Sequence, residues 1–133
     1  MAKIAKITLH WPDSIPRTQF SEQFLQGMLD RLAVAYYNYG PTIRNFPEHY
    51  DALKSMKARV KRYRATRNTE WLMDVGNFAM IEFMYPKLPK AHFRPTSKEE
   101  SPGSVLNDGR VAKGKEHYDP EQGDRLKVRS KRK

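Results

Sequence analysis

The sequence contains no cysteine among its 133 residues. Disulfide bonds, thiolate nucleophiles and cysteine-ligated metals are therefore excluded, and a reducing environment is allowed. No stretch reaches the roughly 18 consecutive apolar residues that a membrane span needs, and the polar N-terminus lacks the apolar core of a signal peptide. We therefore expect a soluble, cytoplasmic protein without a membrane partner.

Familiar catalytic motifs are missing as well. The sequence has no Gly-rich phosphate-binding loop, no GxSxG nucleophile elbow and no HExxH zinc motif. Its histidines are too widely spaced along the chain to form a recognisable zinc site: His10, His49, His92 and His117. Motifs alone therefore assign no reaction to this chain.

Acidic residues are scarce relative to basic ones, with 15 Asp and Glu against 25 Lys and Arg and a net charge of +10. Residues 1–94 hold 15 bases and 8 acids (+7), and residues 95–133 hold 10 bases and 7 acids (+3). The excess is therefore not confined to one end of the chain. It favours anionic partners, namely nucleotides or nucleic acid, through attraction that does not depend on sequence.

The most apolar stretch, residues 68–86, predicts a central helix. Asn68 or Thr69 is suited to cap its start, and Pro86 cannot continue it. Apolar side chains cover nearly its whole circumference, which is typical of a buried helix. One narrow polar stripe at positions i, i+4 and i+7 interrupts this surface: Glu70, Asp74 and Asn77.

Two further helices are predicted before the central one. The first is capped by Ser21 and ends at Gly40, and the second begins at Pro47 and ends near Arg64. Because only residues 65–68 separate the second helix from the central one, the two should form an antiparallel hairpin.

The sequence therefore predicts an all-α protein, a small antiparallel bundle of three main helices. Its segments would be an extended N-terminal arm and linker over residues 1–19, a helical domain over 20–94 and a disordered basic tail over 95–133. The arm alternates apolar and polar residues from Lys3 to Trp11, as a half-buried strand does, but no second strand is evident. It would pack over the helices or pair with a second copy of the chain.

A run of seven bases without an acid occupies the second helix and its end: Lys54, Lys57, Arg59, Lys61, Arg62, Arg64 and Arg67. A solvated helix face normally mixes charges to gain i, i+4 pairs, so the single sign indicates a phosphate-facing surface. An exposed basic helix without a partner is the alternative. The tail ends in a second basic cluster, either a nucleic-acid contact or a solubilising end: Arg125, Lys127, Arg129, Lys131, Arg132 and Lys133.

The acidic stripe of the central helix predicts a metal site. Oxygen ligands suit Mg²⁺, and Glu70 with Asp74 one turn later could share this ion with substrate phosphates while Asn77 orients the substrate. Three bases of the facing helix would contact the phosphates: Lys57, Lys61 and Arg64. Because these bases also recur at i, i+4 and i+7, the alternative is that they pair with the stripe as an interhelical ladder of salt bridges.

Three tyrosines lie near the end of the first helix: Tyr36, Tyr37 and Tyr39. One interpretation is a platform on which nucleic-acid bases stack. The other, which the residues alone favour, is packing in the core and at its rim with the hydroxyl groups in water.

The pattern Glu-x-x-x-Asp-Val-Gly-Asn-Phe-Ala-Met at residues 70–80 resembles the last conserved helix of nucleotide-modification-associated domains. These domains are relatives of the MazG-like all-α nucleotide pyrophosphohydrolases that bacteriophages often encode. Four positions match the acid, Asp, Asn and aromatic residue of that helix: Glu70, Asp74, Asn77 and Phe78. The resemblance extends over residues 21–85 and implies a small phage-type helical bundle that takes nucleoside triphosphates or modified nucleotides with Mg²⁺ and forms a homodimer.

Three functions remain open on this basis. The first is a nucleotide-phosphate-binding protein, either a Mg²⁺-dependent pyrophosphohydrolase-like enzyme or an inactive relative, because a basic helix stands where the wider MazG group carries Glu-Glu-x-x-Glu. The second is a non-catalytic nucleic-acid-binding accessory protein that uses the basic helix and the basic tail. The third is a module that docks an acidic host protein.

Overall fold

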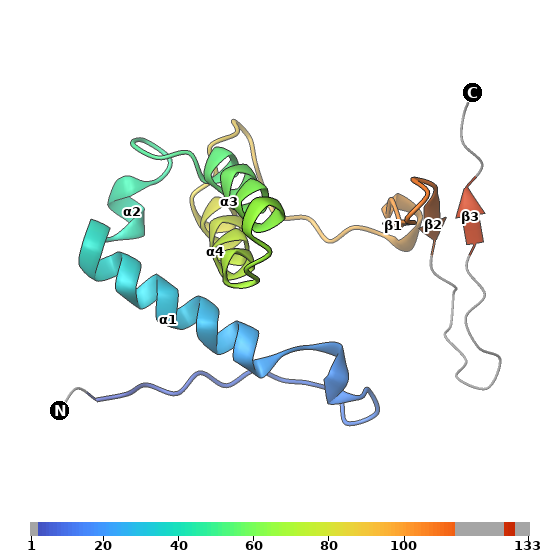
Figure 1. Cartoon of the computed structure of the whole chain (residues 1–133), viewed down its shortest axis with the longest axis horizontal. Helices are drawn as coiled ribbons and strands as arrows, with labels where there is room; N and C mark the ends of the chain where they lie inside the picture. The colour runs from blue at the N-terminus through green and yellow to red at the C-terminus, as the bar shows by residue number, and fades with distance from the viewer. Residues whose placement is uncertain (1–2, 114–126, 130–133) are drawn as a thin grey trace. The chain divides into compact units, whose positions relative to one another are not determined.

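Four helices and a small sheet make up the described part of the chain, which comprises residues 3–113 and 127–129 of a computed structural model (Figure 1). The chain divides into two units, Met1–Ala91 and His92–Lys133. The first unit holds the helices, and the second holds the strands. The predicted all-α bundle with three main helices is confirmed for the first unit.

Helix α1, Glu22–Tyr39, has both of its predicted ends. The hydroxyl group of Ser21 accepts a hydrogen bond from the amide of Phe24 at 3.0 Å, which caps the first turn. Gly40 ends the helix with a φ of 84°, in the left-handed region that glycine adopts without steric cost. The short helix α2, Thr42–Asn45, follows.

Helix α3, Ala52–Thr66, begins five residues later than predicted. Its cap is Asp51, whose carboxylate accepts a hydrogen bond from the amide of Lys54 at 2.9 Å. Pro47 lies in the turn before the helix instead of at its first position, and its peptide bond with Phe46 is cis. The predicted start was wrong because the side-chain cap at Asp51, and not the proline, fixes where this helix begins.

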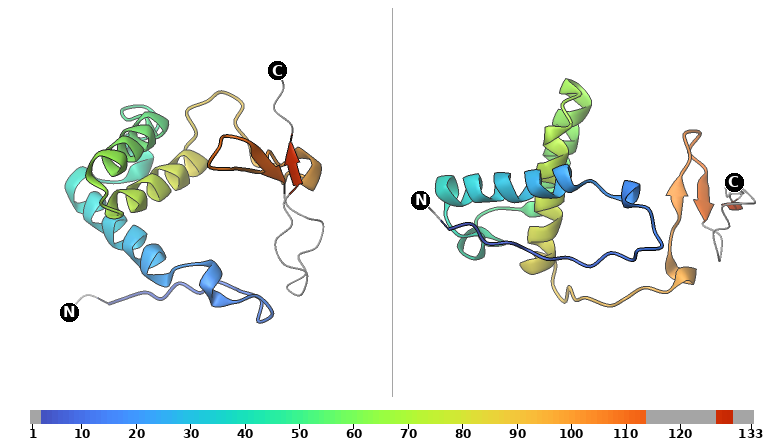
Figure 2. Two further views of the ribbon diagram at one scale, coloured as in Figure 1. Left: turned by 45° about the vertical axis from the view of Figure 1, so that its right-hand side comes forward. Right: turned by 90° about the horizontal axis from the view of Figure 1, so that it is seen from below.

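Helix α4, Glu70–Met84, is the predicted central helix. The side-chain oxygen of Asn68 accepts a hydrogen bond from the amide of Glu70 at 3.0 Å, and the helix stops at Tyr85, directly before the proline. Helices α3 and α4 lie side by side as an antiparallel hairpin, as predicted (Figures 1 and 2).

Helix α1 lies across α4 instead of running along it (Figure 2). Two glycines occupy the crossing point, and each faces a methionine of the other helix. A Cβ atom on Gly27 of α1 would lie 2.5 Å from Met73 of α4, and one on Gly76 of α4 would lie 2.9 Å from the sulfur of Met28 of α1. The missing side chains therefore permit the close approach of the two helices.

Helix α4 is less completely buried than predicted, because most of its residues are half-buried. Among its residues only Asn77 and Ile81 are buried, and Phe83 is 70% exposed. Within the described residues, α3 covers one side of α4 and α1 crosses it over a short length. Two neighbours of this kind cannot enclose a cylinder that is apolar all round. The predicted homodimer, which would cover more of this surface, stays a prediction.

The N-terminal arm is extended but forms no strand over residues 3–11. Its apolar side chains are exposed, with Ile4 at 91%, so the arm does not pack over the helices either. An isolated strand has no partner for its backbone groups, which explains why the alternating pattern alone does not produce one. Pairing of the arm with a second copy stays a prediction. No helix of the described chain has the length and apolarity to cross a membrane.

The second unit contains structure that the sequence did not predict. Strands β1 (Ser104–Val105), β2 (Val111–Lys113) and β3 (Lys127–Arg129) form an antiparallel sheet in the order β1-β2-β3. A tight turn joins the first two, in which the amide of Gly109 bonds the carbonyl of Leu106 at 2.9 Å. The region predicted as a disordered tail therefore includes a short hairpin and a third strand.

Candidate functional site

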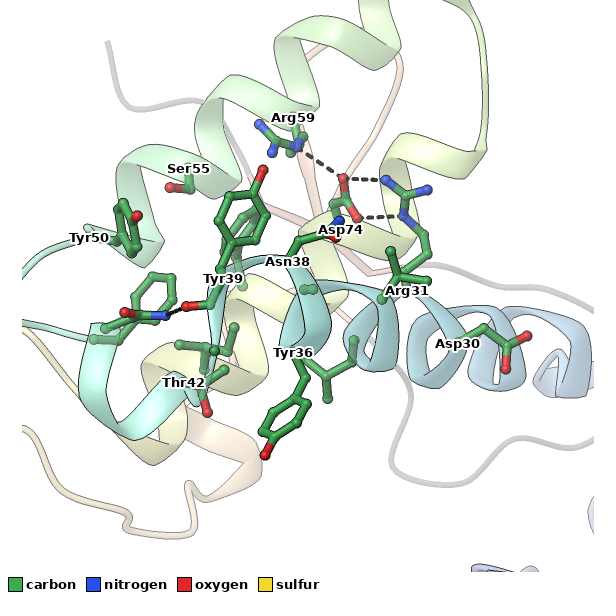
Figure 3. A pocket seen from close by; sticks show the side chains of 18 residues that line it. Asp30, Arg31, Tyr36, Asn38, Tyr39, Thr42, Tyr50, Ser55, Arg59 and Asp74 are labelled. Atoms are coloured by element: carbon green, nitrogen blue, oxygen red, sulfur yellow. Dashed lines mark hydrogen bonds and ion pairs between the residues drawn. The ribbon is translucent and has the colours of Figure 1, made fainter. Parts of the chain in front are cut away.

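Side chains from three helices meet around one carboxylate (Figure 3). Asp74 of α4 accepts two hydrogen bonds from Arg31 of α1, from Nε to Oδ1 at 2.6 Å and from Nη2 to Oδ2 at 3.0 Å. Arg59 of α3 donates a third bond from Nε to Oδ2 at 3.0 Å. Glu70, one turn before Asp74, accepts a bond from Nη1 of Arg31 at 2.5 Å. We call these four residues the ion cluster, and it joins α1, α3 and α4.

The centre of the ion cluster is largely shielded from water. The side chain of Asp74 is 13% exposed, whereas those of Arg31 and Arg59 are 34% and 35% exposed. The guanidinium group of Arg59 also lies over two rings of α4, at 5.7 Å from the centroid of Trp71 and 5.3 Å from that of Phe78. Its two Nη groups make no hydrogen bond to any residue of the described chain. Arg59 is therefore fixed in place but keeps free donors.

Burial is the largest single influence on the pKa of Asp74 and acts to raise it. The hydrogen bonds from Arg31 and Arg59, together with their positive charges, outweigh burial and hold the pKa below its usual value. The hydrogen bond to Asp74 likewise raises the pKa of Arg31. At neutral pH Asp74 and Arg31 are therefore charged.

A pocket of about 720 Å³ opens beside the ion cluster, between α1, α2, α3 and α4 (Figure 3). Pockets of roughly 300–1,000 Å³ are the usual size for bound small molecules. Arg31, Arg59 and Asp74 form part of its lining, and five aromatic side chains form another part: Tyr36, Tyr39, Phe46, Tyr50 and Phe78. Phe46 lies 5.6 Å from Tyr50 and 6.4 Å from Phe78 between ring centroids, so one aromatic wall is packed into a fixed arrangement.

The contacts of Glu70 and Asp74 do not fit the predicted Mg²⁺ site. Both carboxylates are hydrogen-bonded to guanidinium groups, whose positive charge opposes a nearby cation. The described residues contain no group of three or more His, Asp or Glu side chains that could hold a metal. Asp51, a carboxylate on the neighbouring segment, caps α3, and its Oδ2 lies 3.6 Å from the ammonium group of Lys87. Magnesium binding stays a prediction.

Asn77, predicted to orient a substrate, lies in the contact between α1 and α4. It is 6% exposed, and its Nδ2 donates a hydrogen bond to the backbone carbonyl of Met28 at 2.8 Å. Its Oδ1 is buried and has no hydrogen-bond partner within residues 3–113 and 127–129. This position gives Asn77 a role in helix packing, and the proposed substrate contact stays a prediction.

The predicted basic run splits into an inner and an outer part. Arg59 points inward to Asp74, whereas the other six bases are exposed: Lys54, Lys57, Lys61, Arg62, Arg64 and Arg67. Four of these recur at i, i+3, i+7 and i+10, which places them along one line of α3: Lys54, Lys57, Lys61 and Arg64. We call this line the outer face of α3. Arg62 lies toward α4, with its guanidinium carbon 5.4 Å from the centroid of Trp71.

The alternative of an interhelical salt-bridge ladder correctly predicted that the acidic stripe pairs with bases of another helix, but it named the wrong bases. The acidic stripe does bind bases of neighbouring helices, but these are Arg31 and Arg59. Lys57, Lys61 and Arg64 form no ion pair with an acid in the described chain. They are therefore available to an anionic partner.

Arg31 is the functional residue that the sequence analysis missed. It is the single base of α1. It lies on the helix face that contacts α4, because Met28 of that face precedes it by three positions. A lone charge on an apolar stripe indicates a buried partner of opposite sign. The same signal marks Arg59, which follows Met56 by three positions on α3.

The three tyrosines near the end of α1 are exposed, with Tyr37 at 85% and Tyr39 at 68%. The prediction that they pack in the core was therefore wrong, whereas a position at its rim with the hydroxyl groups in water is compatible with these exposed fractions. Tyr36 and Tyr39 line the pocket, and Tyr37 does not. Stacking on bases stays a prediction that these uncovered rings permit.

The basic cluster of the tail is largely beyond the described part of the chain. Lys127 and Arg129 lie in β3. Four further bases fall outside the described residues: Arg125, Lys131, Arg132 and Lys133.

Comparisons with known proteins identify no family. No family model matches the chain, and no curated protein or solved structure is significantly similar to it. The resemblance to MazG-like proteins therefore stays a prediction, and the function has to be argued from the site itself.

Proposed function

We propose that this protein is a non-catalytic nucleic-acid-binding accessory protein that holds phosphate groups on the outer face of α3. The observation that carries the proposal is the row of Lys57, Lys61 and Arg64, exposed side by side without an ion-paired acid in the described chain. Like charges one turn apart destabilise a helix slightly, and an anionic partner would relieve this repulsion. The regularly spaced phosphates of a nucleic acid supply one.

The ion cluster supports this choice over the nucleotide-hydrolase hypothesis. Hydrolysis of a phosphate anhydride usually relies on carboxylates that hold a metal ion, and the two best candidates bind arginines instead. An outer-face contact with phosphates needs no metal and no rearrangement of the cluster. Release of pyrophosphate from nucleoside triphosphates, abolished by Asp74→Asn, would contradict this preference.

Salt dependence of binding tests the proposal. Four phosphate contacts predict that the logarithm of the association constant falls with a slope of about −3 against the logarithm of salt concentration for a single strand. Replacement of Lys57, Lys61 and Arg64 by Glu should weaken binding more than tenfold and flatten this slope. Fluorescence anisotropy with a labelled oligonucleotide measures both quantities.

The matched control changes net charge equally at other exposed positions: Lys3→Glu, Lys6→Glu and Arg44→Glu. Each triple variant lowers the net charge from +10 to +4 (10 − 6). We expect the control to lose much less affinity, because its bases lie on the arm and α2. Equal losses in both variants, or no complex with the unmodified protein at low salt, would overturn the proposal.

A further inference from the structure

The pocket beside the ion cluster presents uncovered aromatic rings to whatever enters it. Tyr36 and Tyr39 line it from α1, and both side chains are more than half exposed. Tyr50 adds a third partly exposed ring on the opposite side of the pocket, before α3. Flat apolar ligands gain most from such walls, and nucleic-acid bases stack on aromatic side chains regardless of base identity.

Hydrogen-bond donors stand in the same pocket. Arg59 uses its Nε for Asp74 and stacks on Phe78, which leaves both Nη groups free within the described chain. A guanidinium group fixed in this way offers a planar pair of donors to a carbonyl or phosphate oxygen without losing further side-chain freedom. Ser55 and Asn38 also line the pocket. The hydroxyl group of Ser55 already donates a hydrogen bond to the backbone carbonyl of Asp51 at 2.8 Å, so towards a ligand it can act as an acceptor.

Helix α3 connects the pocket with the outer face. Ser55 and Arg59, one turn apart, face the pocket, whereas Lys54 and Lys57 lie on the outer face of the same turns. An α-helix with its side chains is about 10–12 Å across. The side chains that α3 contributes to the pocket therefore lie about one helix width from the phosphate-binding row.

We infer that the pocket receives one unstacked base of a single-stranded nucleic acid whose phosphates are held by the outer face of α3. This inference rests on the proposed function and adds the form of the nucleic acid. A duplex keeps its bases stacked and paired, and extruding one costs a few kcal/mol. The protein should therefore prefer single strands, with little dependence on which base is present.

Three oligonucleotides of equal length separate the two proposals: a thymidine single strand, the same backbone without bases, and the corresponding duplex. The abasic strand reports the phosphate contacts alone. Since stacking contributes about 1–3 kcal/mol per base, we expect the thymidine strand to bind at least fivefold more tightly than the abasic one. Equal affinities for these two strands would overturn the inference and leave the proposed function intact. Absence of binding to all three would remove both.

Tyr39→Ala provides the second measurement, with Tyr37→Ala as its control. The two tyrosines are both exposed on α1, but only Tyr39 lines the pocket. We expect Tyr39→Ala to bind the thymidine strand about as weakly as the abasic strand, and to bind the abasic strand with unchanged affinity. We expect Tyr37→Ala to stay within twofold of the unmodified protein. A similar loss in both variants would contradict a specific base pocket.

Discussion

Both faces of α3 carry basic side chains, but these side chains make different interactions on the two faces. On the inner face, Arg59 bonds Asp74 and stacks on Trp71 and Phe78. On the outer face, Lys57 and Lys61 are exposed and have no ion-paired acid in the described chain. The positive charge of a side chain on α3 therefore does not by itself decide its role. The role depends on whether the facing helix presents an acidic side chain to it.

The largest effect should come from removing the carboxylate of Asp74, which binds both Arg31 and Arg59. Asp74→Ala leaves Arg31 and Arg59 partly buried without their partner, so we expect the free energy of unfolding to fall by about 2–3 kcal/mol. Urea unfolding followed by circular dichroism measures this change. Asp30→Ala is the control, because among the described residues Asp30 bonds only Gln26 at the surface of α1, and it should cost less than about 0.5 kcal/mol. Equal losses would mean that the ion cluster does not stabilise the fold.

Acidification should reduce the contribution of Asp74 to the free energy of unfolding. Because the folded protein lowers the pKa of Asp74, its stabilising contribution is complete above the pKa of the unfolded chain, about 4, and is lost as pH falls through the folded-state value. The difference in unfolding free energy between the unmodified protein and Asp74→Asn should therefore shrink below about pH 4. Other carboxyl groups with lowered pKa values, such as those of Asp51 and Glu100, titrate in both proteins and cancel. A difference that stays constant down to pH 2 would contradict the ion-cluster assignment.

The smallest effect, with opposite sign, is expected on the outer face. Lys61 has like-charged neighbours at i−4 and i+3, Lys57 and Arg64, so Lys61→Gln should raise the unfolding free energy by about 0.5 kcal/mol at low salt. The gain should disappear at high salt, where the repulsion is screened. Arg59→Gln, two positions away, should instead lower stability at both salt concentrations. Urea unfolding at two ionic strengths distinguishes the faces, and a loss of stability in Lys61→Gln would show that its charge has a partner.

Features set by a few neighbouring residues were predictable from the sequence. The helix ends at Ser21, Gly40 and Asn68 were predicted correctly, because a cap depends only on the adjacent turn. The hairpin of α3 and α4 is also local, since a link of three residues leaves few alternatives. The turn at Asn107-Asp108-Gly109 carries the usual signal of a β-hairpin, but its short flanking strands lack the alternation that would have drawn attention to it.

Features set by the crossing of distant helices were not predictable in the same way. The polar stripe of α4 was found, but its partner Arg31 is 43 residues away from Asp74. The rotation of α3 about its own axis decides whether Arg59 or Lys61 faces the polar stripe. The N-cap at Asp51 fixes where the helix begins but not this rotation. The packing of the whole helix against α4 fixes the rotation.

The paired glycines and methionines at the crossing of α1 and α4 make this contact sensitive to oxidants. The chain has no cysteine, so its methionine sulfurs are its oxidisable sulfur atoms. Met28 and Met73 are only half-buried, and each fills the space that a glycine of the other helix leaves open. Conversion to the sulfoxide would place a polar oxygen in that space, beside the buried amide of Asn77. Mild peroxide treatment should therefore lower the urea midpoint of unfolding. A Met28→Leu, Met73→Leu variant should show a smaller decrease. Oxidative damage would then act on the same helix crossing that positions Arg31.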